Sequence, residues 1–156
     1  VRFETTHKTI FDFFRLLGFP IGLKSYLTIP SNILSNVNFS IACVRGIFDT
    51  DGSIYQRYSK KYKNHKKHYN YFVIQFKMKS YDIINQIKEI LETNNIKTTK
   101  IGVVKNNCFV VRVTKQESIH LFIKLVKPSN GYHVKRYSDF IYKEKMSPGR
   151  FELPAY

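Results

Sequence analysis

The chain has 156 residues, 43% of them hydrophobic, which is enough for one domain with an apolar core and too few for two full domains. Its apolar stretches fall short of the roughly 20 residues that a membrane helix needs, and Val1-Arg2-Phe3-Glu4 lacks the pattern of a signal peptide, so we expect no membrane segment and a cytoplasmic location. The 26 lysines and arginines exceed the 11 acidic residues, and this formal net charge of +15 favours nucleic acid as the partner over a membrane surface, for which no basic amphipathic helix is clear.

The first third of the chain predicts helices. Apolar residues recur at helical spacing over His7–Leu17, and Gly18 ends this helix. After Pro30 a short helical stretch leads into a longer helix over Phe39–Asp51. We expect Gly52 to close that helix, because glycine best tolerates the left-handed conformation common at helix ends.

The remainder predicts strands and helices in alternation. Tyr69–Lys79 alternates, with Phe72, Ile74, Phe76 and Met78 on a core face and Tyr71, Val73, Gln75, Lys77 and Lys79 on a polar face. The other expected strands are 53–59, 99–105 and 108–114, the last two joined by a turn at Asn106-Asn107, and the other expected helices are 81–93, 117–126 and 132–145. This order predicts an α+β fold of αββαββα type, with one mostly antiparallel sheet, helices on one face and an open polar face.

Two stretches of the chain are alike. Residues 11–18 and 22–26 parallel residues 119–127 and 133–137, each being an apolar helix followed by a break and a lysine. Either this likeness arises by chance, or residues 1–28 are the remnant of a preceding copy. On the second interpretation residues 29–145 form the domain and residues 146–156 a tail.

The end of the second long helix carries the most unusual chemistry. Asp49 and Asp51 lie where a helix already has negative potential, which costs up to about 1 kcal/mol for each carboxylate unless a cation relieves it. The alternative is that both are solvated turn residues before a hairpin. Gly46 and Thr50, one turn apart, would let a second helix approach and bring two acidic ends together, as two-metal phosphodiester cleavage requires.

Residues Val44 to Gly52 resemble the nine-residue signature of the LAGLIDADG homing endonucleases, and Phe48-Asp49-Thr50-Asp51-Gly52-Ser53-Ile54 matches a frequent form of it. The resemblance covers roughly residues 11–144. It implies a saddle-shaped sheet in the DNA major groove, paired signature helices and one metal-binding carboxylate per helix. By position that carboxylate is Asp51, with Mg²⁺ or another divalent cation as cofactor, and Gly46, Asp49 and Thr50 belong to the helix interface.

The same resemblance suggests further site residues. Lys135 falls where the family carries a basic residue, and it could stand with Lys79 near the scissile phosphate; Lys24 would be its counterpart if the repeat is real. Each could equally be a surface lysine. The side chains expected to contact DNA lie on the polar face of the sheet and in the basic hairpin loop: Ser53, Tyr55, Arg57, Ser59, Lys60, Lys61, Lys63, Lys66, Lys67, Tyr71, Val73, Gln75, Lys77 and Arg112.

The sequence therefore favours a sequence-specific, metal-dependent endonuclease that acts on double-stranded DNA as a homodimer through the signature helix. Because the chain has one such signature where the active form of the family needs two, the alternative is a non-cleaving relative that binds DNA or RNA, such as a splicing maturase or an inactive relic. A ribosome-associated basic protein would explain the charge but not the acidic helix end.

Overall fold

The structure, a computed structural model, describes residues 7–18, 26–58 and 70–146. Within them the chain forms an α+β fold, as predicted. The elements in chain order are α1 (Lys8–Leu16), α2 (Ser31–Leu34), α3 (Val37–Asp51), β1 (Gly52–Tyr58), β2 (Asn70–Met78), α4 (Tyr81–Thr93), β3 (Gly102–Val104), β4 (Cys108–Val113), α5 (Gln116–Val126) and α6 (Gly131–Met146). From α3 to α5 this is the predicted αββαββα order.

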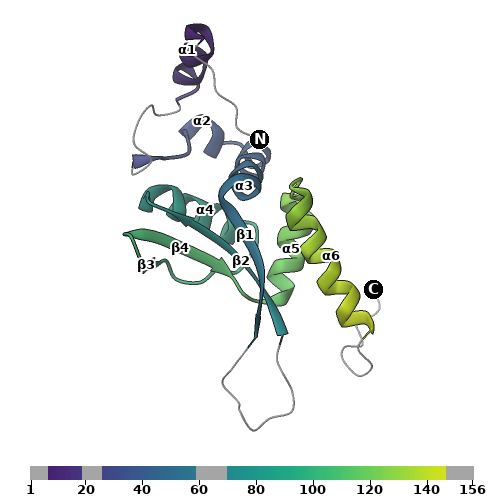
Figure 1. Ribbon diagram of the computed structural model, residues 1–156. Helices are drawn as coiled ribbons and strands as arrows, with labels where there is room; N and C mark the ends of the chain where they lie inside the picture. The colour runs from purple at the N-terminus through teal and green to yellow at the C-terminus, as the bar shows by residue number, and fades with distance from the viewer. Residues whose placement is uncertain (1–6, 19–25, 59–69, 147–156) are drawn as a thin grey trace.

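The strands form one antiparallel sheet in the order β1-β2-β4-β3. Figure 1 shows α4 and α5 behind this sheet, while no helix of the described residues covers the opposite face. Alternation along the strands explains the two faces, since successive side chains point to opposite sides. The side chains that join the core are Ile54 of β1, Phe72, Ile74 and Phe76 of β2, and Val111 and Val113 of β4.

Helix α3 lies against the core through Val44 and Phe48, both fully buried. The Phe48 ring lies 5.5 Å from the ring of Phe76 on β2 and 5.0 Å from that of Phe122 on α5. Burial of a side chain of this size contributes roughly 1.5–3 kcal/mol. Phe48 therefore fixes the last turns of α3 against both the sheet and α5.

The start of α3 differs from the prediction by two residues. The side-chain oxygen of Asn36 accepts hydrogen bonds from the backbone N–H groups of Asn38, at 2.9 Å, and Phe39, at 3.2 Å. These bonds satisfy donors that a helix leaves unpaired at its first turn, so the helix begins at Val37.

The second hairpin turns where the sequence predicts it. Asn106 and Asn107 have φ angles of +66° and +52°, the left-handed conformation that asparagine tolerates. Strand β3 is shorter than predicted, because Thr99 pairs with Arg112 by a backbone and a side-chain hydrogen bond rather than by continuing the ladder.

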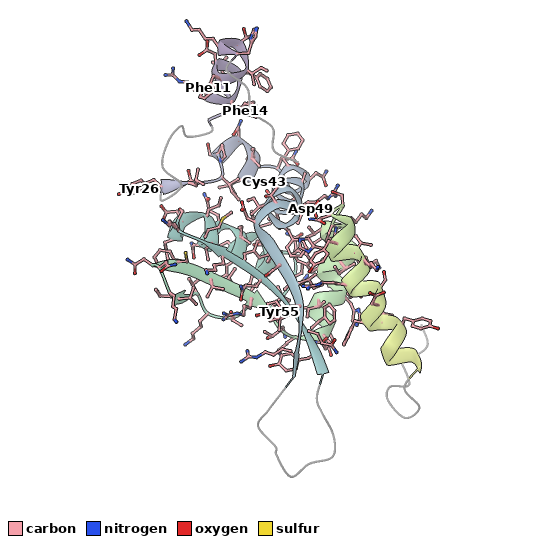
Figure 2. The ribbon with its side chains drawn as sticks, in the orientation of Figure 1. Phe11, Phe14, Tyr26, Cys43, Asp49 and Tyr55 are labelled. Carbon is pink, nitrogen blue, oxygen red and sulfur yellow. The ribbon has the colours of Figure 1, made fainter. Side chains whose placement is uncertain are left out.

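Helix α1 stands apart from the core. None of its residues is buried, and Phe13 and Leu16 are 56% and 86% exposed. Figures 1 and 2 show it beyond α2 at one end of the molecule. The division into a repeat remnant, a domain and a tail stays a prediction. Among the described residues, no helix is long and apolar enough to cross a membrane.

Candidate functional site

The two carboxylates at the end of α3 have different surroundings. Asp49 accepts hydrogen bonds from the backbone N–H and hydroxyl of Ser129, at 3.0 and 2.5 Å, and from the backbone N–H of Asn130, at 3.1 Å. The Asn130 amide donates in turn to the backbone carbonyl of Asp49 at 2.8 Å. Figure 2 shows Asp49 at the end of α3, beside the start of α6. This carboxylate fastens α3 to the segment between α5 and α6.

These hydrogen bonds also set the charge of Asp49. Burial alone would raise the pKa of its carboxyl, but the bonds from Ser129 and Asn130 together outweigh burial and lower that pKa. Asp49 is thus an ionised residue that binds its own domain. Its place at a helix–helix interface stays a prediction, and within the chain its oxygens are engaged by the α5–α6 segment. Ser129 and Asn130 were not among the predicted site residues, although residues of this kind just before a helix are a known signal for its start.

The His133 ring packs against the same end of α3. Its side chain is 7% exposed and its ring lies 4.7 Å from that of Phe48. Burial lowers the pKa of His133, partly offset by the nearby Asp49 charge. Its Nδ1 atom has no hydrogen-bond partner within the described part of the chain. A neutral ring therefore packs under the last turns of α3.

Asp51, by contrast, is exposed, and in the described residues its carboxylate makes no hydrogen bond or ion pair. The next residue, Gly52, has φ of −77° and ψ of 167°, so the prediction of a left-handed helix end is wrong. Glycine is needed there for a different reason. A Cβ on Gly52 would lie 2.3 Å from Cδ2 and 2.6 Å from the backbone oxygen of Phe48. This close approach lets the chain turn directly from α3 into β1 beside Asp51.

The outer face of α3 is open. Gly46 and Thr50 are both exposed, and a Cβ on Gly46 would meet nothing within 4 Å. The Thr50 hydroxyl donates to the carbonyl of Gly46 at 3.0 Å, so it is satisfied inside its own helix. Phe39, two turns earlier and on the same side, is 59% exposed. A second helix would meet an uncharged face here, formed by Gly46, Thr50 and Phe39.

One chain alone offers an incomplete metal site. Among the described residues, no three histidine, cysteine, aspartate or glutamate side chains gather in a group that could hold an ion. Asp51 supplies a carboxylate oxygen, the ligand type that Mg²⁺ prefers. Among the described residues, Asp51 is therefore one possible ligand of a divalent cation and not part of a complete site.

On the open face of the sheet, side chains from three strands are joined. The Oε1 atom of Gln75 on β2 accepts hydrogen bonds from Nε of Arg112 on β4, at 2.8 Å, and from the hydroxyl of Tyr55 on β1, at 3.2 Å. All three side chains are half-buried. The structure thus brings together three of the residues predicted to contact DNA.

The other predicted contact residues are placed less uniformly. Ser53 and Tyr71 are half-buried, and Arg57 and Lys77 are exposed. Val73 is fully buried, so its assignment as a DNA contact is wrong. It lies directly opposite Tyr55 in the sheet, whose side chain extends toward Gln75 along the same face. The following residues lie outside the described part of the chain: Lys24, Ser59, Lys60, Lys61, Lys63, Lys66 and Lys67.

The two lysines expected near a scissile phosphate are both exposed. Lys79 directly follows β2, and Lys135 lies in the first turns of α6. Within the described residues neither forms an ion pair with Asp51. Their roles stay predictions.

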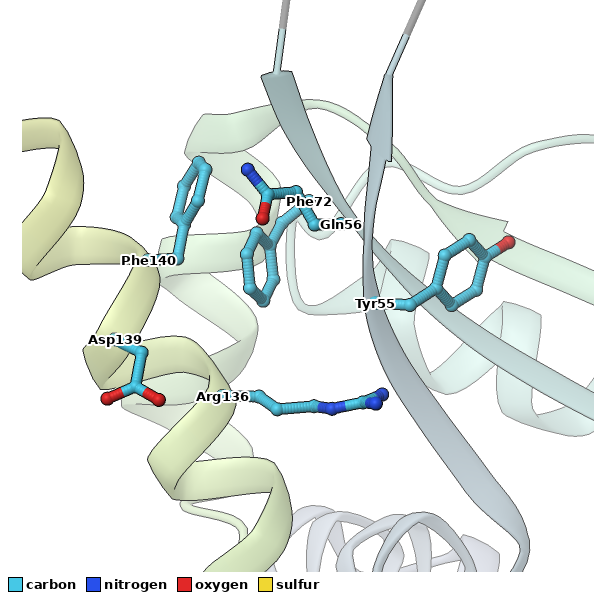
Figure 3. Close-up of a pocket in the computed structure, with 6 residues that line it drawn as sticks. All are labelled: Tyr55, Gln56, Phe72, Arg136, Asp139 and Phe140. Carbon is cyan, nitrogen blue, oxygen red and sulfur yellow. The ribbon is translucent and has the colours of Figure 1, made fainter.

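A pocket of about 330 Å³ separates β1 from α6 (Figure 3). The Arg136 guanidinium donates to the carbonyl of Ile54 at 2.9 Å and stacks over the Tyr132 ring at 4.3 Å. Figure 3 shows Tyr55 projecting from β1 on the side away from α6. Arg136 thus fastens α6 to the edge strand and leaves the open face of the sheet uncovered.

A sequence model of the family described as the LAGLIDADG-like domain matches residues 38–127. The chain belongs to this family. The LAGLIDADG-like match includes nearly all of α3, with Asp51 at its end, the entire sheet and α5. No curated protein sequence matches the chain.

Solved homing endonucleases share the fold at low sequence identity. I-CvuI in complex with the I-CreI target has a TM-score of 0.55 and 15% identity, over 69% of this chain and 66% of its own. I-TnaI has a TM-score of 0.52 and 12% identity, over 67% of this chain and 74% of its own. I-LtrWI bound to target DNA has a TM-score of 0.51 and 15% identity, over 72% of this chain and 41% of its own. The chain thus spans slightly less than two thirds of I-CvuI and about two fifths of I-LtrWI.

Proposed function

We propose that this LAGLIDADG-like domain is a sequence-specific homing endonuclease domain that cleaves double-stranded DNA with a divalent cation. The observation that carries the proposal is the state of Asp51. Its carboxylate is exposed and makes no contact within the described residues, at the end of a helix whose outer face is open, although the neighbouring Asp49 is fully engaged.

DNA binding is supported by the charge and by the sheet. A formal net charge of +15 draws the chain toward phosphates, and the open face presents Gln75 and Arg112, which are side chains suited to base edges in the major groove. Similar folds occur in I-CvuI and I-LtrWI, both solved with target DNA. The same face would carry Arg57 and Lys77 to the phosphate backbone.

Cleavage requires more than one carboxylate. We infer that two signature helices meet at Gly46 and Thr50 around a twofold axis, so that each contributes one Asp51. A cation held by this pair would neutralise the charge that develops on the attacking and leaving oxygens. Lys79 and Lys135 would add positive charge beside the phosphate. I-CvuI has been solved with DNA in the presence of Mg and of Ca, which supports a divalent cation.

A non-cleaving relative is the second candidate. It is favoured by the single signature helix among the described residues. Such a protein would bind DNA or RNA through the sheet without completing the metal site.

Replacement of Asp51 by asparagine tests the proposal. Loss of a metal ligand removes stabilisation of the transition state, so we expect no cleavage of a target duplex with Mg²⁺ present and DNA binding within about tenfold of the unaltered chain. The matched control is Asp82→Asn, which makes the same charge change at an exposed position of α4.

The outcomes separate the two candidates. Cleavage by the unaltered chain and by Asp82→Asn, but not by Asp51→Asn, supports the endonuclease. Undiminished cleavage by Asp51→Asn contradicts the role of Asp51. Tight binding without cleavage by every protein, at concentrations where the chain is dimeric, supports the non-cleaving relative.

A further inference from the structure

The hydrogen-bonded row Tyr55–Gln75–Arg112 crosses the open face of the sheet. Gln75 lies on β2, between β1 and β4, and is directly paired with Arg112. Tyr55 is paired with Val73, two residues before Gln75, and reaches diagonally to the same amide. These contacts hold three polar side chains in fixed positions before any ligand arrives.

The chemistry of the partners fixes the orientation of the Gln75 amide. A guanidinium can only donate hydrogen bonds, so the amide atom 2.8 Å from Arg112 Nε must be the oxygen. That oxygen cannot donate, so the Tyr55 hydroxyl 3.2 Å away donates to it as well. Both acceptor positions of the oxygen are then used. The Gln75 Nε2 group makes no hydrogen bond within the described residues and remains a donor.

The Gln75 and Arg112 side chains therefore present donors only, whereas the Tyr55 oxygen, which donates its proton to Gln75, can only accept. Besides Gln75 Nε2, the two terminal nitrogens of Arg112 have no hydrogen-bond partner in the part of the chain that the structure describes. Guanine shows two acceptors, O6 and N7, in the major groove, whereas adenine shows one acceptor and one donor. A glutamine that reads adenine needs a free oxygen to accept from that donor. Here the oxygen is already occupied.

We propose that the Tyr55–Gln75–Arg112 row is a base-reading unit that selects guanine over adenine at the one position of the DNA target that Arg112 faces. This rests on the proposed function, in which the open face of the sheet enters the major groove. Arg112 donates to guanine, Gln75 supplies a further donor, and Tyr55 keeps the amide oxygen from serving adenine. The preference at that position is roughly tenfold to hundredfold, as for other good two-point base contacts.

Two conservative variants probe the two halves of the unit. Arg112→Lys keeps the charge but loses the paired donors, so we expect the guanine preference to fall to less than about threefold at one position while selection elsewhere stays. Tyr55→Phe frees one acceptor site of the Gln75 oxygen, so we expect adenine to become accepted at the position that Gln75 faces. Arg15→Lys on α1, away from the sheet, is the matched control.

The experiment is selection of bound duplexes from a randomised DNA library by the purified full chain, followed by affinity measurements on single-base variants of the selected site. Melting temperatures of all variants within about 2 °C of the unaltered chain would show that folding is kept. A guanine whose selection depends on Arg112 supports the inference. An unchanged base preference in both variants, or selection of adenine at the position whose preference changes in Arg112→Lys, overturns it while leaving DNA binding intact. Failure of the unaltered chain to bind any duplex overturns the proposed function as well.

Discussion

Replacement of Asp49 by asparagine keeps the size of the side chain but removes its charge and one of its two acceptor oxygens. The groups that face it are all donors: the backbone N–H and hydroxyl of Ser129 and the backbone N–H of Asn130. The new amide would point its own hydrogens at some of them. We expect the variant to fold less stably, because the attachment of α3 to the α5–α6 segment is weakened.

The magnitude follows from the number and kind of bonds. A hydrogen bond to a charged group contributes about 1.5–3 kcal/mol, and loss of one partner from a buried site costs about as much again. Asp49 is half-buried and Ser129 is exposed, so water replaces part of what is lost. The net loss is therefore about 2 kcal/mol, which lowers the melting temperature of a chain of this length by about 4–8 °C.

Thermal melting and urea titration measure this loss. The matched control is Asp139→Asn, which makes the same charge change at an exposed position of α6 where the described residues provide no hydrogen bond to the carboxylate. Equal melting temperatures for Asp49→Asn and Asp139→Asn would refute the reasoning, since charge alone would then account for the effect.

The same bond has a pH dependence. The pKa of Asp49 is lowered in the folded chain, so the carboxylate stabilises the fold above its unfolded pKa of about 3.9, and this contribution is lost as the pH falls through the lower folded value. The stability difference between the unaltered chain and Asp49→Asn should thus be constant near neutral pH and shrink below about pH 4. If the stability difference persists unchanged below pH 4, its cause is packing and not the charge of Asp49.

Three other perturbations test separate features. Gly52→Ala places a Cβ against the Phe48 backbone and should cost about 1–3 kcal/mol in urea denaturation, whereas Gly102→Ala, 3.6 Å from a Val110 methyl, should cost much less; equal losses would contradict the steric argument. A Cβ at Gly46 would meet nothing within 4 Å, so Gly46→Leu should leave the monomer folded but abolish dimers and cleavage together; sedimentation that still detects dimers would rule out this interface. DNA affinity should fall steeply with salt, by about 0.9 in log–log slope per phosphate contacted, and a slope near zero would exclude phosphate contacts.

The sequence predicts the fold well where a repeating pattern reports burial. The alternation over residues 69–79 places Phe72, Ile74 and Phe76 in the core, because one face of that strand is covered by helices. The same pattern predicts on which face of the sheet a side chain lies, but not how much of that side chain is exposed. Val73 lies on the polar face as predicted, yet it is fully buried, and alternation alone does not predict this.

Long-range contacts account for what the sequence does not predict at the site. Asp49 and its partners Ser129 and Asn130 are 80 or more residues apart, and no local pattern links them. The bond between Gln75 and Arg112 likewise depends on β2 and β4 being neighbours in a particular register. Local sequence rules predict a left-handed helix end at Gly52. The structure instead requires glycine there because a Cβ would clash with Phe48.

The two acids of the signature differ because of helix geometry. Residues two positions apart on a helix point about 200° away from each other around its axis, so Asp49 and Asp51 cannot share a neighbour on the same side. Asp49 turns to the α5–α6 segment, and Asp51 is exposed to solvent. Anchoring one acid holds the helix end in place while the other stays available. Loss of stability with Asp49→Asn and loss of cleavage with Asp51→Asn should therefore be separable, although the residues are nearly adjacent in sequence.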